Sequence, residues 1–503
     1  MAIVNATVRR ADFDHPYRAA GNVTAKATST RLLTLVVASA LFMESLVSTV
    51  IATSLAAMAA DLGVDPISLK LAFTAYYVAL AIFIPISGWC ADRFGAKTVF
   101  AAAIAVFTLS SVACALAGDM RSLIFGRFCQ GLGGAMMLPV GRLVLLRAIP
   151  KREMLSAMAW LSIPTLFAPI MGPPVGGFIT TYYHWRGIFW LNVPVGIVGL
   201  VLALWLVPQV RADSRRPLDW TGFALTGLGL SLAVFGFTLL GSGASAANSA
   251  RLAAAAMMAS GGALLGLYLW HAGRTTHPII DLTLLHIASF RLSLWGGLLF
   301  RLSVGAVPFL LPLMLQVGFG MTPFESGSLT FASAVGALTM KIVASPILRR
   351  WGFRRVLSVN AVISSVLLAA SAAFTAVTPH AVIIVLLLAA GFFRSLQFTS
   401  LNTLAYADID SPRMSQATSF VGVVQQLSLS GGVAVAAMLL DVSRTFEGRT
   451  ALVADDFGRA FIAIGLIALT STLFMRQLAP DAGSEVSGHR HDPEPEPAEP
   501  GQG

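Results

Sequence analysis

Charged residues are scarce in this chain of 503 residues, where Asp, Glu, Lys and Arg together make up 12%. A soluble domain contains about 25% of these residues, and here hydrophobic residues reach 56%. The composition therefore excludes an ordinary soluble domain and favours a polytopic membrane protein. The formal net charge of +10 does not indicate nucleic-acid binding, because the basic residues are spread over short connections between apolar runs.

Cysteine is scarce as well. The three cysteines, Cys90, Cys114 and Cys129, lie in or beside apolar runs and lack metal-ligand spacing, so we expect small buried apolar residues. The sequence contains no catalytic triad, zinc spacing or dinucleotide fingerprint, and segment 94–98 lacks the spacing of a phosphate-binding loop. We expect no enzyme activity, no metal, no cofactor and no nucleotide. Residues 1–31 are polar and mildly basic, which argues against a cleaved signal peptide.

Long apolar runs are what the chain has in abundance. A helix needs about 20 apolar residues to cross the hydrocarbon core, and by this measure we expect about 14 transmembrane helices in an all-α protein. The expected organisation is an N-terminal tail (1–31), a six-helix bundle (32–207), a linker with two extra spans (208–289), a second six-helix bundle (290–478) and a disordered tail (479–503).

The basic residues predict how the chain lies in the membrane. Under the positive-inside rule, cytoplasmic connections contain more Lys and Arg than the opposite ones. Segments 9–31, 93–97, 211–216 and 349–355 are rich in these residues, and the connections between them are poorer. With an even number of spans, both termini are expected in the cytoplasm.

Two segments of the first bundle recur in the second. Segment 349–355 is a degenerate echo of the charged turn 88–97, displaced by 257 residues at the shared glycine (352 against 95). Segment 394–397 echoes the Arg-x-x-Gln of 127–130, displaced by 267 residues (394 against 127). Two echoes at nearly one offset indicate a duplicated six-helix unit, in which segment 208–289 has no counterpart.

Four segments resemble, in order, the signatures of one family. Segment 88–97 resembles its loop signature, and 123–133 resembles a fourth-helix motif built around a membrane-embedded arginine. Segment 168–177 resembles the fifth-helix motif of antiporters, and 185–196 the start of the sixth helix. The family is the major facilitator superfamily, and within it the drug:proton antiporters with fourteen spans (EmrB/QacA-like multidrug efflux transporters).

The resemblance implies the major facilitator fold, with two six-helix bundles and an inserted helix pair. It implies proton-coupled efflux of amphiphilic or toxic small molecules by alternating access, in a bacterial inner membrane. The expected partners are then the small-molecule substrate, protons and the lipid bilayer, and an accessory periplasmic subunit is compatible with this picture. Nucleic acid and nucleotide are not expected, so an ion gradient would supply the energy.

The charged turn matches the loop signature at Gly88, Asp92, Arg93, Gly95 and Lys97. The glycines allow a sharp turn and close packing of two helices, and the three charged side chains form a polar cluster. We expect this cluster to act as a gate at the cytoplasmic end. Position 96 departs from the signature, because alanine stands where a basic residue is usual.

The fifth-helix motif contains Gly172, Pro173, Gly176 and Gly177. Glycine and proline allow a membrane helix to bend and to approach a neighbour closely. The resemblance implies that these residues form a tight contact that prevents leak and favours exchange. Ordinary glycine packing within a membrane helix is the alternative.

Charged residues within the expected spans are few, since a charge near the bilayer centre costs about 2.5–3.5 kcal/mol on insertion scales. The candidates placed well inside a span are Glu44, Arg127, Arg301, Lys341 and Arg394. Glu44 is the carboxylate among them, and we hypothesise that it is the proton or substrate site, with Arg127 as its tuning partner. The alternatives are a permanent ion pair or polar packing for Glu44, and a helix-to-helix contact for Arg127.

One departure from the resembled subfamily concerns the first helix, where Val47 occupies the position of its usual aspartate. Glu44 lies three residues earlier on nearly the same face, so either Glu44 replaces that carboxylate or the coupling chemistry differs. The remaining candidates for the central cavity are Arg301, Lys341, Arg394 and Gln397.

Three functions stay open. The first is proton-coupled efflux of amphiphilic molecules. The second is proton-coupled transport of a natural organic anion or metabolite, because basic residues outnumber carboxylates within the spans. The third is a transporter-like receptor that moves no solute, which the intact charged turn argues against.

Overall fold

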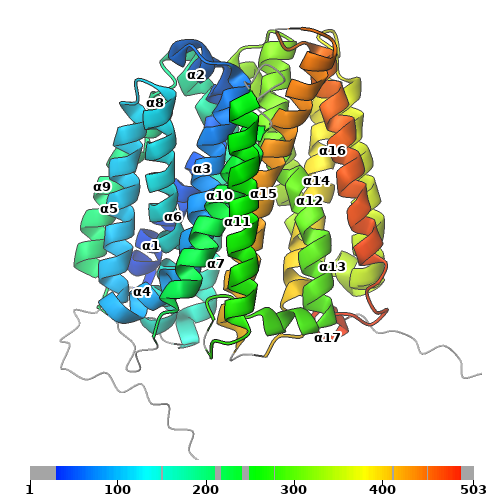
Figure 1. The fold of residues 1–503 in the computed structure, drawn as a ribbon. Helices are drawn as coiled ribbons and strands as arrows, with labels where there is room; N and C mark the ends of the chain where they lie inside the picture. Colours follow the sequence, from blue (N-terminus) through cyan, green and yellow to red (C-terminus); the bar gives the residue numbers. More distant parts are fainter. Residues whose placement is uncertain are drawn as a thin grey trace, which may run out of the picture.

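The computed structural model describes residues 30–148, 151–209, 217–240, 248–276, 278–410, 413–449 and 451–488. Within these ranges all regular elements are helical, and the long helices lie side by side in one bundle (Figure 1). The predicted tails 1–31 and 479–503 lie mostly outside the described residues. Within 479–488 the chain forms turns and the short helix α17 (Ser484–Ser487).

The first half of the chain contains the elements that follow. They are α1 (Thr30–Val50), η1 (Ile51–Ser54), α2 (Leu55–Leu62), η2 (Pro66–Leu69), α3 (Lys70–Phe83), η3 (Ile84–Ile86), α4 (Ser87–Phe94), α5 (Ala96–Ala115), α6 (Met120–Ala148), α7 (Lys151–Tyr182), α8 (Gly187–Trp190) and α9 (Asn192–Leu206). Short 3-10 segments interrupt the first two spans without ending them, because their apolar runs continue on both sides.

The second half begins at the 3-10 helix η4 (Leu282–His286). It continues with α12 (Ala288–Leu313), the π-helical η5 (Met314–Gly318), α13 (Pro323–Ala370), η6 (Ser371–Ala373), α14 (His380–Ala405), α15 (Met414–Phe446) and α16 (Ala454–Met475). Helix α13 bends at Gly352, whose φ of 67° and ψ of 162° are not helical. Glycine adopts this conformation without a steric cost, so the chain reverses there as it does at Gly95, where φ is 94°.

Twelve segments of the described chain are long and apolar enough to cross a membrane. One of them, Pro323–Ala373, contains the bend at Gly352, and α7 is not among the twelve. The expected count of about 14 spans therefore stays a prediction.

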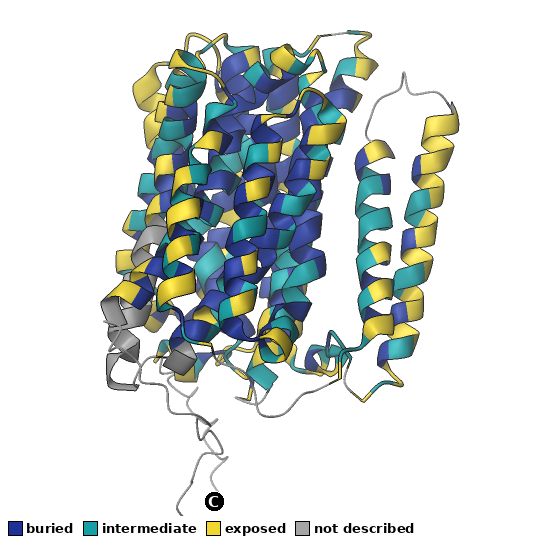
Figure 2. Ribbon diagram, turned by 90° about the vertical axis from the view of Figure 1, so that its left-hand side faces the viewer, coloured by how far each residue is buried: buried dark blue, intermediate teal, exposed yellow. Residues whose placement is uncertain are grey.

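The helix pair α10 (Trp220–Leu240) and α11 (Asn248–Ala272) stands at the side of the bundle (Figure 2). Helix α10 contacts α3 and α15, so it covers the line along which the two halves meet. Helix α11 exposes large apolar side chains such as Leu252 and Trp270, which suit a lipid environment.

Over the first two helices of each half, the backbone repeats itself at a displacement of 257 residues. Gly63 and Gly320 both have positive φ, and so do Gly95 and Gly352. Asp65 and Thr322 are the corresponding N-cap residues, each followed by proline at the first helical position. The register of the repeat is thus defined at three points across the first two helices of each half.

Substitution of Gly95 tests whether the charged turn has the positive φ that the repeat predicts there. Gly95→Ala forces a side chain into a conformation that is essentially confined to glycine, at a cost of about 1–3 kcal/mol. Gly88 in the same turn is helical, and a Cβ there meets nothing within 4 Å. We expect Gly95→Ala to lower the thermal unfolding midpoint of the purified protein and Gly88→Ala to leave it within experimental error. Equal midpoints for the two variants would contradict this reading.

Candidate functional site

A cavity of 1360 Å³ lies between the two halves. Helices α1, α3, α4 and α6 of the first half and α14 and α15 of the second contribute to its wall. The cavity extends from Glu44, in the second half of α1, to the charged turn, where Gly88, Asp92 and Arg93 line it. The structure thus joins the predicted carboxylate and three of the predicted gate residues in one space, while Gly95 and Lys97 lie outside its lining.

Glu44 is half-buried in the cavity wall. Its Oε1 accepts a hydrogen bond of 3.2 Å from the hydroxyl of Tyr76 on α3, and Oε2 accepts one of 3.4 Å from Ser45. Gly134 on α6 faces it, and a Cβ at that glycine would lie 3.4 Å from Glu44 Cγ. The carboxylate therefore has hydrogen-bonding partners on one side and open space on the other.

Arg127 on α6 is 1% exposed. Its Nη1 donates to Gln130 Oε1 over 2.5 Å, and Gln130 Nε2 donates to Ser111 Oγ on α5 over 2.7 Å. Its guanidinium carbon lies 4.2 Å from the ring centroid of Tyr76, which is a cation–π geometry. The arginine is thus held by neutral groups.

Tyr76 connects the two predicted site residues. Its hydroxyl contacts Glu44 and its ring faces Arg127, and no ion pair joins Glu44 to Arg127 among the residues described. Sequence reasoning missed this role, because adjacent tyrosines in an apolar run are typical of core packing. Tyr76 is 1% exposed. Its place between a carboxylate and an arginine is visible only in the three-dimensional structure.

The second-half candidates do not line the cavity. Gln397 is fully buried, accepting from Asn360 Nδ2 over 2.8 Å, and Arg394 donates to Ser333 Oγ over 2.7 Å. Lys341 is exposed on α13. Arg301 is also buried outside the lining, so none of these four belongs to the wall of the cavity in this structure. Their role in a cavity stays a prediction.

The fifth-helix motif lies at the far end of the molecule, opposite the charged turn. A Cβ at Gly172 would lie 2.0 Å from Thr49 Oγ1 of α1, and one at Gly177 would lie 2.4 Å from the carbonyl oxygen of Pro323. From the other side, a Cβ at Gly327 would lie 2.2 Å from the carbonyl oxygen of Pro173. These backbones are so close that only glycine fits, and the contact joins the two halves.

Polar contacts between the halves accompany this close packing. Arg444 of α15 pairs with Asp65 of the first half, at 2.5 Å, and with Asp441 on its own helix, at 2.7 Å. Gln316 Nε2 donates to the carbonyl oxygen of Thr53 over 3.0 Å. The two halves are therefore held together at the far end, whereas the cavity separates them near the charged turn.

The sixth-helix motif begins at the same end. Trp185 Nε1 donates to Asp61 Oδ2 over 3.0 Å, Arg186 pairs with the same carboxylate, and Arg186 Nη2 donates to the carbonyl oxygen of Ala117 over 2.9 Å. These contacts tie α2, α8 and the α5–α6 connection of the first half into one rigid rim.

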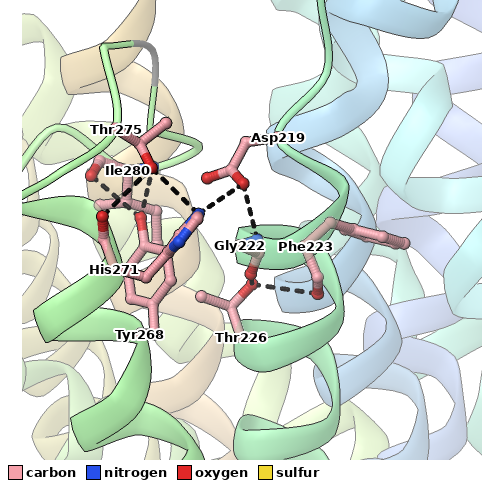
Figure 3. A network of polar contacts seen from close by, with 8 residues as sticks. All are labelled: Asp219, Gly222, Phe223, Thr226, Tyr268, His271, Thr275 and Ile280. Carbon is pink, nitrogen blue, oxygen red and sulfur yellow. Dashed lines mark hydrogen bonds and ion pairs between the residues drawn. The ribbon is translucent and has the colours of Figure 1, made fainter.

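The base of the helix pair is fixed by a second polar network (Figure 3). Asp219 Oδ1 accepts from the backbone N–H of Gly222 over 2.7 Å and lies 2.8 Å from His271 Nε2. Tyr268 receives a hydrogen bond of 2.9 Å from the N–H of Ile280 and donates one of 3.1 Å to its carbonyl oxygen. The network thus fixes the start of α10 and the end of α11 to the segments that connect the pair to the bundle.

Those connecting segments form part of the cavity. Residues 217–220 and 278–279 line it next to the charged turn. The rings of Trp220 and Trp89 meet edge to face, with centroids 5.7 Å apart. Sequence reasoning treated the inserted pair as a linker, and its contribution to the cavity depends on long-range contacts that composition does not encode.

The far-end contact gives a second test. Gly177→Leu places a side chain where no space exists, and overpacking of this kind costs about 1–3 kcal/mol. We expect the variant, reconstituted in vesicles, to show a faster passive proton leak than the unaltered protein, because the halves no longer close at that end. Gly262→Leu is the matched control, since Gly262 on α11 is exposed with nothing within 4 Å of a Cβ. Equal leak rates in the two variants would contradict a sealing role.

Two related halves around a central cavity, built from membrane-spanning helices, define the class of multi-pass membrane transporters. The chain belongs to the Major Facilitator Superfamily, whose family model matches residues 37–433 and 293–500. The first range contains every residue that lines the cavity, and the two ranges overlap within the second half.

Curated relatives and solved structures agree with this family. A protein of Escherichia coli named "Putative multidrug resistance protein MdtD" is 35% identical over 82% of this chain and 86% of its own length. A protein of the same name from Yersinia enterocolitica is 34% identical over 89% of this chain and 95% of its own length. The crystal structure of a D-xylose-proton symporter has a TM-score of 0.64 at 15% identity, covering 90% of this chain and 99% of that one. This last likeness concerns the fold.

Proposed function

We propose that this protein is a secondary active transporter of the bacterial inner membrane, with both termini in the cytoplasm. It exports amphiphilic small molecules in exchange for protons by alternating access. The observation that supports the proposal most directly is the cavity that leads from the charged turn to Glu44 while the far end is closed by contacts between the halves. The names of the relatives, which refer to multidrug resistance, support a range of drug-like substrates.

Glu44 is the proposed proton site. A negative charge costs more where water is excluded than where water has access, so the protonation of this carboxylate and the side to which the cavity opens are linked. The hydroxyl of Tyr76 holds the carboxylate, and the guanidinium of Arg127 lies over the ring of the same tyrosine. The membrane potential adds about 2.3 kcal/mol per 100 mV for each charge moved, which can drive such a cycle.

The coupling test uses reconstituted vesicles in which substrate-induced proton movement is measured. We expect proton release on addition of a lipophilic cation to the unaltered protein, and at least a tenfold smaller response from Glu44→Gln, in line with a lost general acid–base group. Glu485→Gln is the matched control, since Glu485 lies in α17, away from the cavity. An unchanged response from Glu44→Gln would reject Glu44 as the coupling group.

The second candidate function, transport of an organic anion, is favoured by one observation. Arg93 and Arg142 line the cavity, and Arg301 is buried behind its wall. In the same vesicles, a proton response to organic anions but not to lipophilic cations would replace the first function by this one.

The charged turn is the proposed gate, and Asp92 is its acidic member. Asp92 lines the cavity at the end where the halves are apart, so it is placed to make closing contacts when that end shuts. We expect Asp92→Asn to reduce the transport rate about tenfold through the loss of a charge-assisted contact, with an unchanged amount of protein in the membrane. Loss of the protein from the membrane would instead make Asp92 a folding residue.

A further inference from the structure

The repeat places two opposite charges at equivalent positions. The displacement of 257 residues that relates Gly63 to Gly320 and Gly95 to Gly352 also relates Glu44 to Arg301. Both lie in the first helix of their half, α1 and α12, before the helix reaches the far end. The duplicated architecture therefore puts a carboxylate on one side of the central cavity and a guanidinium on the other.

The surroundings of Arg301 leave most of its hydrogen-bonding capacity unused. The side chain is 1% exposed, and Nη2 donates to Asn402 Oδ1 over 2.7 Å. The atoms Nε and Nη1 are buried and have no hydrogen-bond partner in the described part of the chain. A buried charged donor without a partner is costly, so an acceptor that arrives with a ligand would recover that cost.

A single layer of side chains separates Arg301 from the cavity. Its partner Asn402 lines the cavity, and so does Phe398, whose ring centroid lies 5.7 Å from the guanidinium carbon. Gln426 on α15 lines the same wall and has a buried Oε1 without a partner. The second-half wall is thus polar and backed by positive charge, opposite the carboxylate of Glu44.

We propose that Glu44 and Arg301 form a bipolar binding site whose substrates are amphoteric amphiphiles, with a cationic group for Glu44 and a carboxylate for Arg301 and Asn402. The guanidinium fork matches a carboxylate, which makes charge-assisted bonds with it. A cavity of 1360 Å³ accommodates a drug-sized molecule that spans both groups. The proposal rests on the proposed transport function and defines its substrate class.

Further charges face the cavity and enter the design of the test. Asp92, Arg93, Arg142 and Asp219 line it on the side of the charged turn, away from the deep end at Glu44. Arg142 is the competing site for a carboxylate, so Arg142→Gln is compared with Arg301→Gln.

The experiment measures the binding of rhodamine B and of its ethyl ester to the purified full-length protein in detergent micelles, by fluorescence anisotropy against protein-free micelles. The two dyes share one cationic ring system and differ in the carboxylate. We expect the protein to bind rhodamine B about tenfold more tightly than the ester, the effect of a charge-assisted bond. Arg301→Gln should abolish this preference and keep the affinity for the ester, while Glu44→Gln should weaken both dyes.

Arg476→Gln is the matched control, because it removes a cation from the same half at an exposed position outside the cavity. Arg301→Lys, which keeps the charge and loses the fork, should retain part of the preference and shows that the site still folds. Equal binding of the two dyes by the unaltered protein, or a preference that survives Arg301→Gln and disappears in Arg142→Gln, would overturn the proposal.

A transport assay separates this proposal from the proposed function. If the vesicles show no proton-coupled export of either dye while the binding preference depends on Arg301, the bipolar site stands and the transport function fails. If both dyes are exported with equal efficiency and equal affinity, the transport function stands and the bipolar site fails.

Discussion

The cost of charge in a low-dielectric interior governs how this molecule is built. The arginines in its membrane region are held by neutral groups: Arg127 by Gln130 and Tyr76, and Arg394 by Ser333. These neutral partners accept hydrogen bonds from some of the guanidinium donors and do not cancel the charge. Under the proposed function, Glu44 in the cavity wall and a bound molecule are the sources of negative charge near these arginines.

The two ends of the molecule differ in the strength of their contacts. At the far end, Gly177 and Gly327 bring the backbones of the two halves into direct contact, and Arg444 pairs with Asp65 at the rim. Partly exposed ion pairs are worth about 1 kcal/mol or less, so they guide closure without making it permanent. The close packing at one end and the cavity at the other are the two features that an alternating-access cycle has to exchange.

The sequence indicated the all-helical fold, the repeat and the motif positions because each depends on local composition or fixed spacing. It did not indicate that Tyr76 joins Glu44 to Arg127, since that contact depends on how α1, α3 and α6 rotate about their axes. It placed Arg301 among the cavity candidates, and the structure places it behind Asn402, an uncharged residue outside every motif. A single neutral polar residue such as Asn402 gives no periodic signal in the sequence, so the sequence did not predict its contact with Arg301.

The most direct test of alternating access is a distance measurement between nitroxide labels at positions 184 and 380, in a variant whose native cysteines are replaced. His184 lies in the first half and His380 begins α14 in the second. In lipid nanodiscs, we expect a short distance and a second, longer one whose populations shift when the pH or the substrate concentration changes. The shift should be absent in Glu44→Gln. A single distance under all conditions would contradict the account.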